Sequence, residues 1–192
     1  MIDIEKKIDE HVEVIRATRS LGGMLGEVGR LMANRLAAGG KILWMGNGGS
    51  AADSQHLAAE IVGRFSRERP ALPSIALTTD TSILTSVGND YGYEKVFSRQ
   101  IEALCQPGDV VVGISTSGNS ANVLEGLKAA RGREALTVGL TGGDGGLLGP
   151  LVDYCLIVPS RDTARIQEAH ILMGHLLCDW VETELADGAG SS

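Results

Sequence analysis

The stretch KILWMGNGGSAADSQHLAAEIVGRF, residues 41–65, decides the fold of this chain. Residues 42–45 form a short apolar run, which has the length of a strand covered on both faces. The glycines that follow let the backbone turn sharply and let a ligand come close to it. Ser50 suits the N-cap of a helix that begins after this loop. The stretch therefore predicts a buried strand, a glycine-rich loop and a helix.

The predicted helix carries an imidazole and a carboxylate on one face. His56 and Glu60 are four positions apart, which places them one turn apart on an α-helix. Such a pair is more often structural than a ligand pair, so the spacing alone decides nothing. These two residues do, however, follow directly on a loop that can hold a polar ligand. The combination is the first sign of a site.

Strand-like and helix-like runs alternate through the rest of the chain. Further strands are predicted at residues 74–78, 110–114, 136–140 and 155–158, helices at 94–104, 121–131 and 163–185, and a loop with a short helical turn at 79–93. Short apolar strands alternating with helices are typical of a parallel sheet covered on both faces. The sequence therefore predicts an α/β protein, a three-layer αβα sandwich with a five-stranded parallel sheet.

Two amphipathic helices are predicted ahead of the sheet, at residues 2–18 and 21–36. Helices outside an α/β core often pack against a partner subunit, although packing on their own core is the simpler alternative. We expect residues 1–192 to form a single domain, with extra N-terminal helices within 1–38 at a subunit interface and a disordered tail at 186–192.

The composition excludes several classes of function. A net charge of -7 leaves no basic surface for nucleic acid or an anionic membrane, and an aromatic content of 4% argues against base stacking. The three cysteines are widely spaced in apolar surroundings, so buried thiols in a reducing compartment are favoured over a disulfide framework or a zinc cluster. The charged N-terminus and the lack of a long apolar run predict a cytoplasmic protein that binds neither membrane nor nucleic acid.

Polar loops follow four of the predicted strands: GNGGS, TTDTS, STSGNS and TGGDGG. In an open parallel sheet, ligands bind beyond the carboxyl ends of the strands. The hydroxyls of STSGNS, together with backbone N–H groups at a helix N-terminus, suit a phosphate. One such loop is more often only an N-cap with a tight turn, but three hydroxyls in a row opposite a second polar loop favour phosphate. Neither a Walker-type lysine nor the G-x-G-x-x-G spacing is present, so nucleotide and dinucleotide sites are disfavoured.

The last predicted helix adds an amide and two histidines in RIQEAHILMGH. Gln167, His170 and His175 lie within just over two turns, and Gln167 and His175 are about 80° apart around the axis, so both can face one cleft. With His56 and Glu60 they could hold a divalent metal such as zinc. Alternatively, Glu60 or His175 could act as acid or base. The residues leave these two interpretations open.

Other polar residues near these segments have two interpretations each. Asn89 and Asp90 could bond sugar hydroxyls or form a plain turn. Arg161 and Arg165 flank the start of the last helix, where either could neutralise phosphate or simply be solvated. His11 is most simply a solvated residue of the first helix.

The segments GNGGSAADSQHLAAE, LTSVGNDYGYEKVFSRQ, GISTSGNSANVL and RIQEAHI together resemble the sugar-isomerase (SIS) family, and more narrowly the phosphoheptose isomerases. The resemblance covers nearly the whole chain except the extreme N-terminus and the tail. The STSGNS loop marks the SIS fold in general. The pair of patterns H-x-x-x-E and Q-x-x-x-x-x-x-x-H is more specific to the heptose enzymes.

The resemblance implies an aldose–ketose isomerase. Family members convert D-sedoheptulose 7-phosphate to D-glycero-D-manno-heptose 7-phosphate through an enediol. This is the first step of nucleotide-activated heptose biosynthesis for lipopolysaccharide or other surface glycans. Family members are homotetramers with active sites between subunits, which agrees with the extra N-terminal helices.

The resemblance also implies a role for each residue of its motifs. The phosphate is expected on Ser115, Thr116, Ser117 and Ser120. The sugar is expected to contact Asn47, Gly48, Gly49, Glu60, Asn89, Asp90 and Gln167. One zinc ion per subunit is expected on His56, Glu60, Gln167 and His175. For the reaction we expect Glu60 as the base at carbon and His175 as the acid at oxygen. Ala164 stands where some members carry an acidic residue, so the resemblance assigns no auxiliary proton transfer to that loop.

Two alternatives come from other classes of protein. The first is a non-catalytic SIS scaffold that binds the replication initiator, which the presence of all four expected metal and catalytic positions argues against. The second is a sugar-phosphate-sensing regulatory domain, which is usually attached to a DNA-binding module that 192 residues of net charge -7 do not accommodate. Within the enzyme hypothesis, another sugar phosphate such as a pentose phosphate is an alternative substrate.

Overall fold

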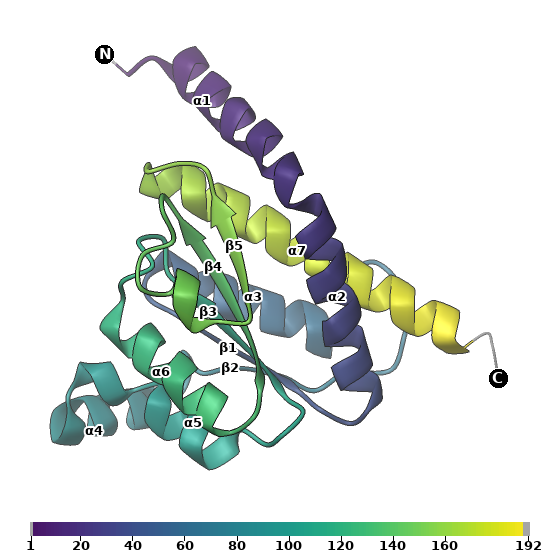
Figure 1. Cartoon of the computed structure of the whole chain (residues 1–192), viewed down its shortest axis with the longest axis vertical. Helices are drawn as coiled ribbons and strands as arrows, with labels where there is room; N and C mark the ends of the chain where they lie inside the picture. Colours follow the sequence, from purple (N-terminus) through teal and green to yellow (C-terminus); the bar gives the residue numbers. More distant parts are fainter. Residues whose placement is uncertain (1, 190–192) are drawn as a thin grey trace.

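Five parallel strands run through the middle of the molecule in the order β2-β1-β3-β4-β5 (Figure 1). The computed structural model describes residues 2–189. The strands are β1 (Ile42–Gly46), β2 (Ser74–Ala76), β3 (Val110–Ile114), β4 (Leu136–Gly142) and β5 (Tyr154–Val158). The predicted five-stranded parallel sheet is therefore confirmed.

Helices cover both faces of this sheet, as the sequence predicts. They are α1 (Ile4–Ala17), α2 (Gly22–Ala37), α3 (Gly49–Val62), α4 (Thr81–Tyr91), α5 (Ser98–Leu104), α6 (Ala121–Gly132) and α7 (Thr163–Ala189). Short 3-10 turns are η1 (Thr18–Leu21), η2 (Tyr93–Lys95) and η3 (Gly149–Leu151). Helices α2, α3 and α7 lie on one face, and α4, α5 and α6 lie on the other (Figure 1).

The burial of strand β1 on both faces explains why residues 42–45 are all apolar. Ile42 and Trp44 face the core beneath α2, α3 and α7, whereas Leu43 and Met45 face the core beneath the opposite layer. All four side chains are completely buried. Because a parallel strand in the middle of a sheet has no solvent face, it shows no polar alternation.

The two N-terminal helices differ in how they are packed. Helix α2 belongs to the core, where Val28 and Met32 are buried and a methyl group at Gly29 would come within 2.7 Å of Trp180. Helix α1 extends beyond the sheet (Figure 1), and none of its described residues is buried. Ile4 and Ile8 on α1 are 68% and 56% exposed. Helix α2 therefore packs on the core of its own chain. The expected role of the N-terminal helices at a subunit interface stays a prediction.

Two local expectations are corrected by the structure. Ser50 is not an N-cap: α3 begins at Gly49, and Ser50 lies inside it with its backbone N–H donating to the Asn47 carbonyl. Gly48 takes the cap position, with φ of +56° that favours glycine. The expected loop at 79–93 is mostly helix α4, because the Asp80 carboxylate caps it by accepting from the Ile83 N–H at 2.9 Å.

Other boundaries shift by smaller amounts. The predicted helix at 94–104 is η2 followed by the shorter α5, and the predicted strand at 74–78 ends at Ala76. Helix α7 continues to Ala189, so the first part of the expected disordered tail is helical, and residues 190–192 lie outside the described part of the chain. Of the three free thiols, Cys105 and Cys178 are buried but Cys155 is only half-buried. None of the helices within residues 2–189 is both long and apolar enough to cross a membrane.

Candidate active site

Helices α3 and α7 bring two histidines and a carboxylate together. The Nε2 atom of His56 lies 2.9 Å from Nε2 of His175 and 3.2 Å from an oxygen of Glu60. One ligand atom from each of the three residues lies within 4.8 Å of the other two. His56 is half exposed and the other two are partly buried, so the cluster opens to solvent.

The contact between α3 and α7 depends on a glycine. Gly174 has no side chain where α7 crosses α3, and a methyl group there would overlap the buried Leu57 side chain. His175 follows Gly174 directly, and His56 precedes Leu57. The close approach of the two helices therefore places the two imidazoles against each other.

The donor set of this cluster fits a divalent metal ion. Tetrahedral zinc with ligands at about 2.0–2.1 Å holds its ligand atoms roughly 3.3 Å apart. The two nitrogen atoms at 2.9 Å and the nitrogen–oxygen pair at 3.2 Å are close to that spacing. Two imidazoles and a carboxylate are also a ligand combination that zinc prefers. The residues present therefore could hold such an ion.

Gln167, the fourth expected ligand, lies at the other end of α3. A methyl group at Gly49 would come within 2.6 Å of the Gln167 amide nitrogen, so the amide packs against the first residue of that helix. His56 comes two turns, or about 10 Å, further along the axis. The structure thus brings three of the four expected ligands together and places the fourth beside the glycine-rich loop.

The STSGNS loop lies between β3 and α6 and is stabilised by a hydrogen bond between two of its own side chains. The Ser115 and Ser120 hydroxyl oxygens lie 2.9 Å apart, and Ser115 is buried. Ser120 is the N-cap residue of α6, but its side chain makes no capping bond to that helix. The N-terminus of α6 thus begins beside these hydroxyls without a cap from the Ser120 side chain, and a helix N-terminus next to hydroxyl groups suits an anion.

A second glycine loop, TGGDGG after β4, packs tightly against the first. Gly118 has φ of +67°, and a methyl group there would overlap the Gly145 carbonyl. The Leu148 N–H donates to the Gly118 carbonyl at 3.0 Å, and the Asn119 side chain accepts from the Leu147 N–H at 3.1 Å. The two loops therefore form one interlocked unit at the carboxyl edge of the sheet.

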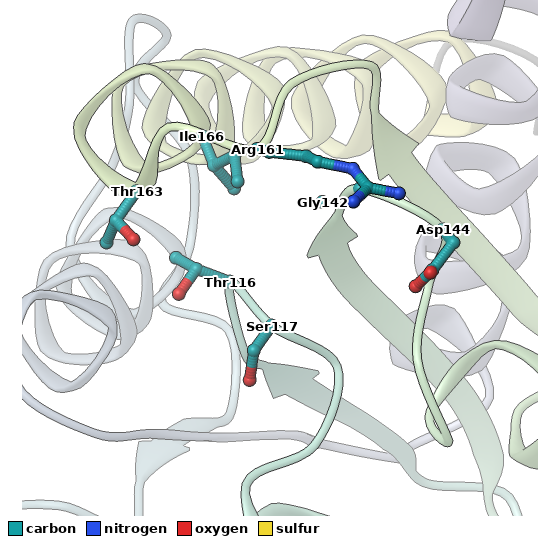
Figure 2. A pocket seen from close by; sticks show the side chains of 8 residues that line it. Thr116, Ser117, Gly142, Asp144, Arg161, Thr163 and Ile166 are labelled. Carbon is teal, nitrogen blue, oxygen red and sulfur yellow. The ribbon is translucent and has the colours of Figure 1, made fainter.

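A cavity of about 210 Å³ opens beside this unit (Figure 2). In Figure 2 the Thr116 and Ser117 side chains come from the loop after β3, and Arg161 extends past Gly142 from the segment before α7. The other residues that line it are Gly143, Asp144, Thr163 and Ile166. Hydroxyl groups and one guanidinium group around a small cavity are suitable for a phosphate.

Asn47 in the first glycine loop is fixed by a partner that the sequence does not reveal. Its amide exchanges two hydrogen bonds of 2.8 Å with the amide of Asn122, which is buried at the start of α6. The Tyr93 hydroxyl donates to the Asn47 side-chain oxygen at 3.4 Å. Asn122 follows the STSGNS motif by two positions, but only the structure shows that it links the first and third strand-end loops.

Asn89 and Asp90 lie at the exposed end of α4 rather than in a loop. The Asn89 amide donates to the Asp90 carboxylate at 2.8 Å, and both side chains are exposed. Asn47 in the neighbouring loop contacts Tyr93, three residues after Asp90, so this end of α4 adjoins the glycine-rich loop. Their expected role toward a sugar stays a prediction.

Two other histidines lie outside the cluster. His170 is completely buried, and its Nε2 lies 3.1 Å from the Thr141 carbonyl oxygen. Burial lowers the pKa of His170 to about 4, although the Thr141 carbonyl opposes this shift. His11 is not simply solvated, because its Nδ1 lies 2.7 Å from the Glu168 carboxylate. Arg165 also bonds Glu168, at 2.6 Å, and so does not face the cavity beside Thr116.

Asp53 is a carboxylate near the cluster that the sequence analysis missed. It lies on α3 one turn before His56, and its Oδ2 is buried without a hydrogen-bond partner among the described residues. Burial raises the pKa of Asp53 to about 6, while His56 opposes the shift. This carboxyl group next to His56 therefore contributes to the electrostatics of the site.

Comparisons with known proteins agree with this geometry. The SIS domain family matches residues 6–142. A phosphoheptose isomerase of Geobacter sulfurreducens is 57% identical over 184 residues, which is 95% of this chain and 97% of that protein. The chain belongs to the phosphoheptose isomerase family.

Solved structures of phosphoheptose isomerases have the same fold. The enzyme GmhA of Neisseria gonorrhoeae superimposes with a TM-score of 0.88 at 46% identity, over 94% of this chain and 97% of that one. A phosphoheptose isomerase of Francisella tularensis gives a TM-score of 0.91 at 37% identity, over 94% and 96% of the two chains. The likeness to solved phosphoheptose isomerases thus covers 94% of this chain.

Proposed function

We propose that this chain is an aldose–ketose isomerase that converts D-sedoheptulose 7-phosphate to D-glycero-D-manno-heptose 7-phosphate. The observation that carries the proposal is the meeting of His56, Glu60 and His175 in a chain of the phosphoheptose isomerase family. The reaction would supply the first intermediate of nucleotide-activated heptose synthesis for surface glycans.

Substrate binding is assigned to the strand-end loops. Ser115, Thr116, Ser117 and Ser120 would hold the phosphate, and the interlocked loops beside the cavity support this role. The sugar would lie against Asn47, Gly48 and Gly49, whose backbone is exposed in a loop without side chains at two positions. Further sugar contacts are assigned to Glu60, Asn89, Asp90 and Gln167.

Proton transfer is assigned to the cluster between α3 and α7. Glu60 would remove a proton from C1 of the ketose while His175 gives a proton to the oxygen on C2, which yields the enediol. Return of the proton from Glu60 to C2 and loss of the C1 hydroxyl proton to His175 then give the aldose. The two groups belong to one cluster, so they can act on adjacent atoms of one substrate.

A zinc ion, one per subunit, is proposed on His56, Glu60, Gln167 and His175. When bound, it would supply a positive charge that polarises the oxygens on C1 and C2. The contacts support three of these ligands, and Gln167 rests on the resemblance.

A homotetramer in the cytoplasm is the assembly we propose. The uncovered isoleucines of α1 support it, as do Leu176 and Trp180 on α7, which are 46% and 43% exposed. The scaffold alternative is not favoured, because the chain shares 54–63% identity with proteins named as phosphoheptose isomerases and retains the expected cluster.

The proposal is tested by incubating the purified protein with sedoheptulose 7-phosphate and following the aldose by NMR, before and after chelation. Conversion that is lost on chelation and restored by zinc would support both the reaction and the metal. Conversion that does not depend on chelation would remove the metal from the mechanism. Absence of conversion by folded protein would overturn the proposal. It would favour a non-catalytic scaffold, or an isomerase that acts on another sugar phosphate.

A matched pair of variants assigns the metal to the cluster. His56→Ala removes a proposed ligand, whereas His11→Ala removes a histidine that is bonded to Glu168, which is not a proposed ligand. Zinc content is expected to fall from about one per subunit to near zero in the first variant only. Equal zinc content in both would contradict the proposed site.

A further inference from the structure

A buried carboxylate on α7 binds the chain segment that follows α3. Glu182 is 2% exposed and accepts hydrogen bonds from three consecutive backbone N–H groups, at 2.7, 2.9 and 2.9 Å. These groups belong to Phe65, Ser66 and Arg67. The Ser66 hydroxyl at 3.3 Å and Nε of the Arg69 guanidinium at 3.0 Å add two further bonds. None of the motifs or catalytic roles described above uses Glu182.

Glu182 is held as an anion. Burial alone would raise the pKa of this carboxyl, but the N–H groups of residues 65–67 and the Arg69 guanidinium lower it to about 2. A buried charge with this many donors fixes the geometry of its partners, because loss of a bond leaves the charge less well compensated. Residues 65–69, which we call the brace segment, are therefore anchored to α7.

Both ends of the brace segment touch the cluster. The Phe65 ring stacks on the His175 imidazole, with centroids 5.2 Å apart and planes inclined by 28°. At the other end, Nη2 of Arg69 donates to the backbone carbonyl of Glu60 at 2.9 Å. Glu182 itself lies two turns beyond His175 on α7, so a single buried group constrains contacts to a proposed acid and a proposed base.

We propose that Glu182 is a positioning residue, which acts through the brace segment to hold the His175 ring and the Glu60 backbone in the geometry that binds zinc. The inference rests on the proposed function. Outer partners of metal ligands typically contribute 10–100-fold to metal affinity or activity. The pathway from Glu182 runs through Phe65 to His175 and through Arg69 to Glu60, and none of these contacts involves the STSGNS loop.

The fold offers a matched control at the opposite edge of the sheet. Asp109 is 2% exposed and accepts from the backbone N–H groups of Lys41 and Gln106, and from the Lys41 ammonium at 2.6 Å. It thus resembles Glu182 in burial and bonding. It precedes β3 at the amino end, whereas the site lies at the carboxyl end. A purely structural effect of losing a buried anion should appear equally in both.

The experiment compares Glu182→Gln with Asp109→Asn in the full chain. We expect both to lower the melting temperature, but only Glu182→Gln to raise the zinc dissociation constant, by about 10- to 100-fold, in a competition titration with a chromophoric chelator. The kcat of Glu182→Gln should fall, while KM for the sugar phosphate stays within about 2-fold because the phosphate loop is untouched. Unchanged zinc affinity in folded Glu182→Gln would overturn the proposal.

A second pair of variants keeps the test decisive if Glu182→Gln does not fold. Phe65→Leu removes the ring that stacks on His175, and Phe65→Tyr retains it. We expect weaker zinc binding and an altered visible spectrum of the cobalt-substituted protein in Phe65→Leu, with recovery of both in Phe65→Tyr. Equal behaviour of the two variants and the parent would overturn the positioning role alone. A parent protein that neither binds zinc nor isomerises the substrate would overturn the proposed function as well.

Discussion

Nε2 of His56 and Nε2 of His175 face each other at 2.9 Å, although 119 positions separate the two residues in the chain. The contact exists because α7 crosses α3 at Gly174 without a side chain between them. Residues that form one proposed metal site therefore depend on the packing of two helices over the sheet. Changes in that packing should appear in metal binding as well as in stability.

Gly174→Ala tests this dependence. The added methyl group would overlap Leu57, which is completely buried, so we expect a loss of about 1–3 kcal/mol in unfolding free energy from overpacking. Zinc affinity should fall in parallel, because the two imidazoles are moved apart. Gly23→Ala in α2 is the control, since a methyl group there meets nothing within 4 Å. Urea unfolding and zinc titration of both variants measure the two effects, and unchanged zinc affinity in Gly174→Ala would refute the coupling.

Glu60→Gln should abolish turnover and leave the fold intact. Loss of a general base typically lowers the rate by about 10²–10⁴-fold. Glu68→Gln serves as control, because the Glu68 side chain is 91% exposed and forms an ion pair with Arg64 in the same segment. The measurement is kcat with sedoheptulose 7-phosphate, together with circular dichroism. Near wild-type activity of Glu60→Gln would exclude Glu60 as the base.

Arg161→Gln is expected to weaken substrate binding without slowing the chemistry. Arg161 lines the cavity next to Thr116 and Ser117, and an exposed charge of this kind contributes up to about 1 kcal/mol, or roughly a 5-fold rise in KM. Arg165→Gln should leave KM nearly unchanged, because Arg165 is bonded to Glu168. Initial rates of both variants at low and high salt give the KM values to be compared. A rise in KM for both variants, or for neither, would show that Arg161 has no specific role in substrate binding.

His170 should make the metal-free protein less stable in acid. Its pKa is about 4 in the folded chain and near 6.5 when unfolded, so below about pH 6.5 the unfolded chain binds a proton that the folded chain does not. Stability from this residue is thus present above pH 6.5 and is lost as pH falls toward 4. Between pH 7.5 and 5 the loss amounts to about 2 kcal/mol.

The His170→Gln variant isolates this contribution. Whatever it costs in packing at pH 7.5, the stability difference from the parent should shrink by about 2 kcal/mol at pH 5, because glutamine does not titrate. Urea unfolding with a chelator at both values measures the change. A difference that is independent of pH would show that folding does not shift the pKa of His170.

The sheet could be predicted because its information is local. Residues 42–45 are apolar at every position since both of their faces are buried, and each of the other strands shows a similar short run. Helix α4 was missed because Thr81, Thr85 and Gly88 are poor helix formers. Its stability comes instead from the Asp80 cap and from packing of Leu84 and Val87 on the core.

The candidate site was predictable only in part. The spacing of His56 and Glu60 is a local signal, and that of Gln167 and His175 is another, but neither says that His175 meets His56 while Gln167 packs on Gly49. Glu182 gave no signal, because its bonding partners lie 113 to 117 positions earlier in the chain. Supporting contacts of this kind arise from tertiary packing, which no periodicity in the sequence records.

The position of β1 between β2 and β3 has a consequence for folding. Ile42 pairs with Ser74 on one side and with Val110 on the other, so β1 gains its second neighbour only after a long stretch of chain has been ordered. Closing such a loop costs entropy before the pairing compensates for it, which slows folding of parallel sheets. The GNGGS and STSGNS loops meet only at that step, and His175 arrives with the last helix. During refolding, catalysis should therefore return later than helix content, which makes it the stricter measure of native structure.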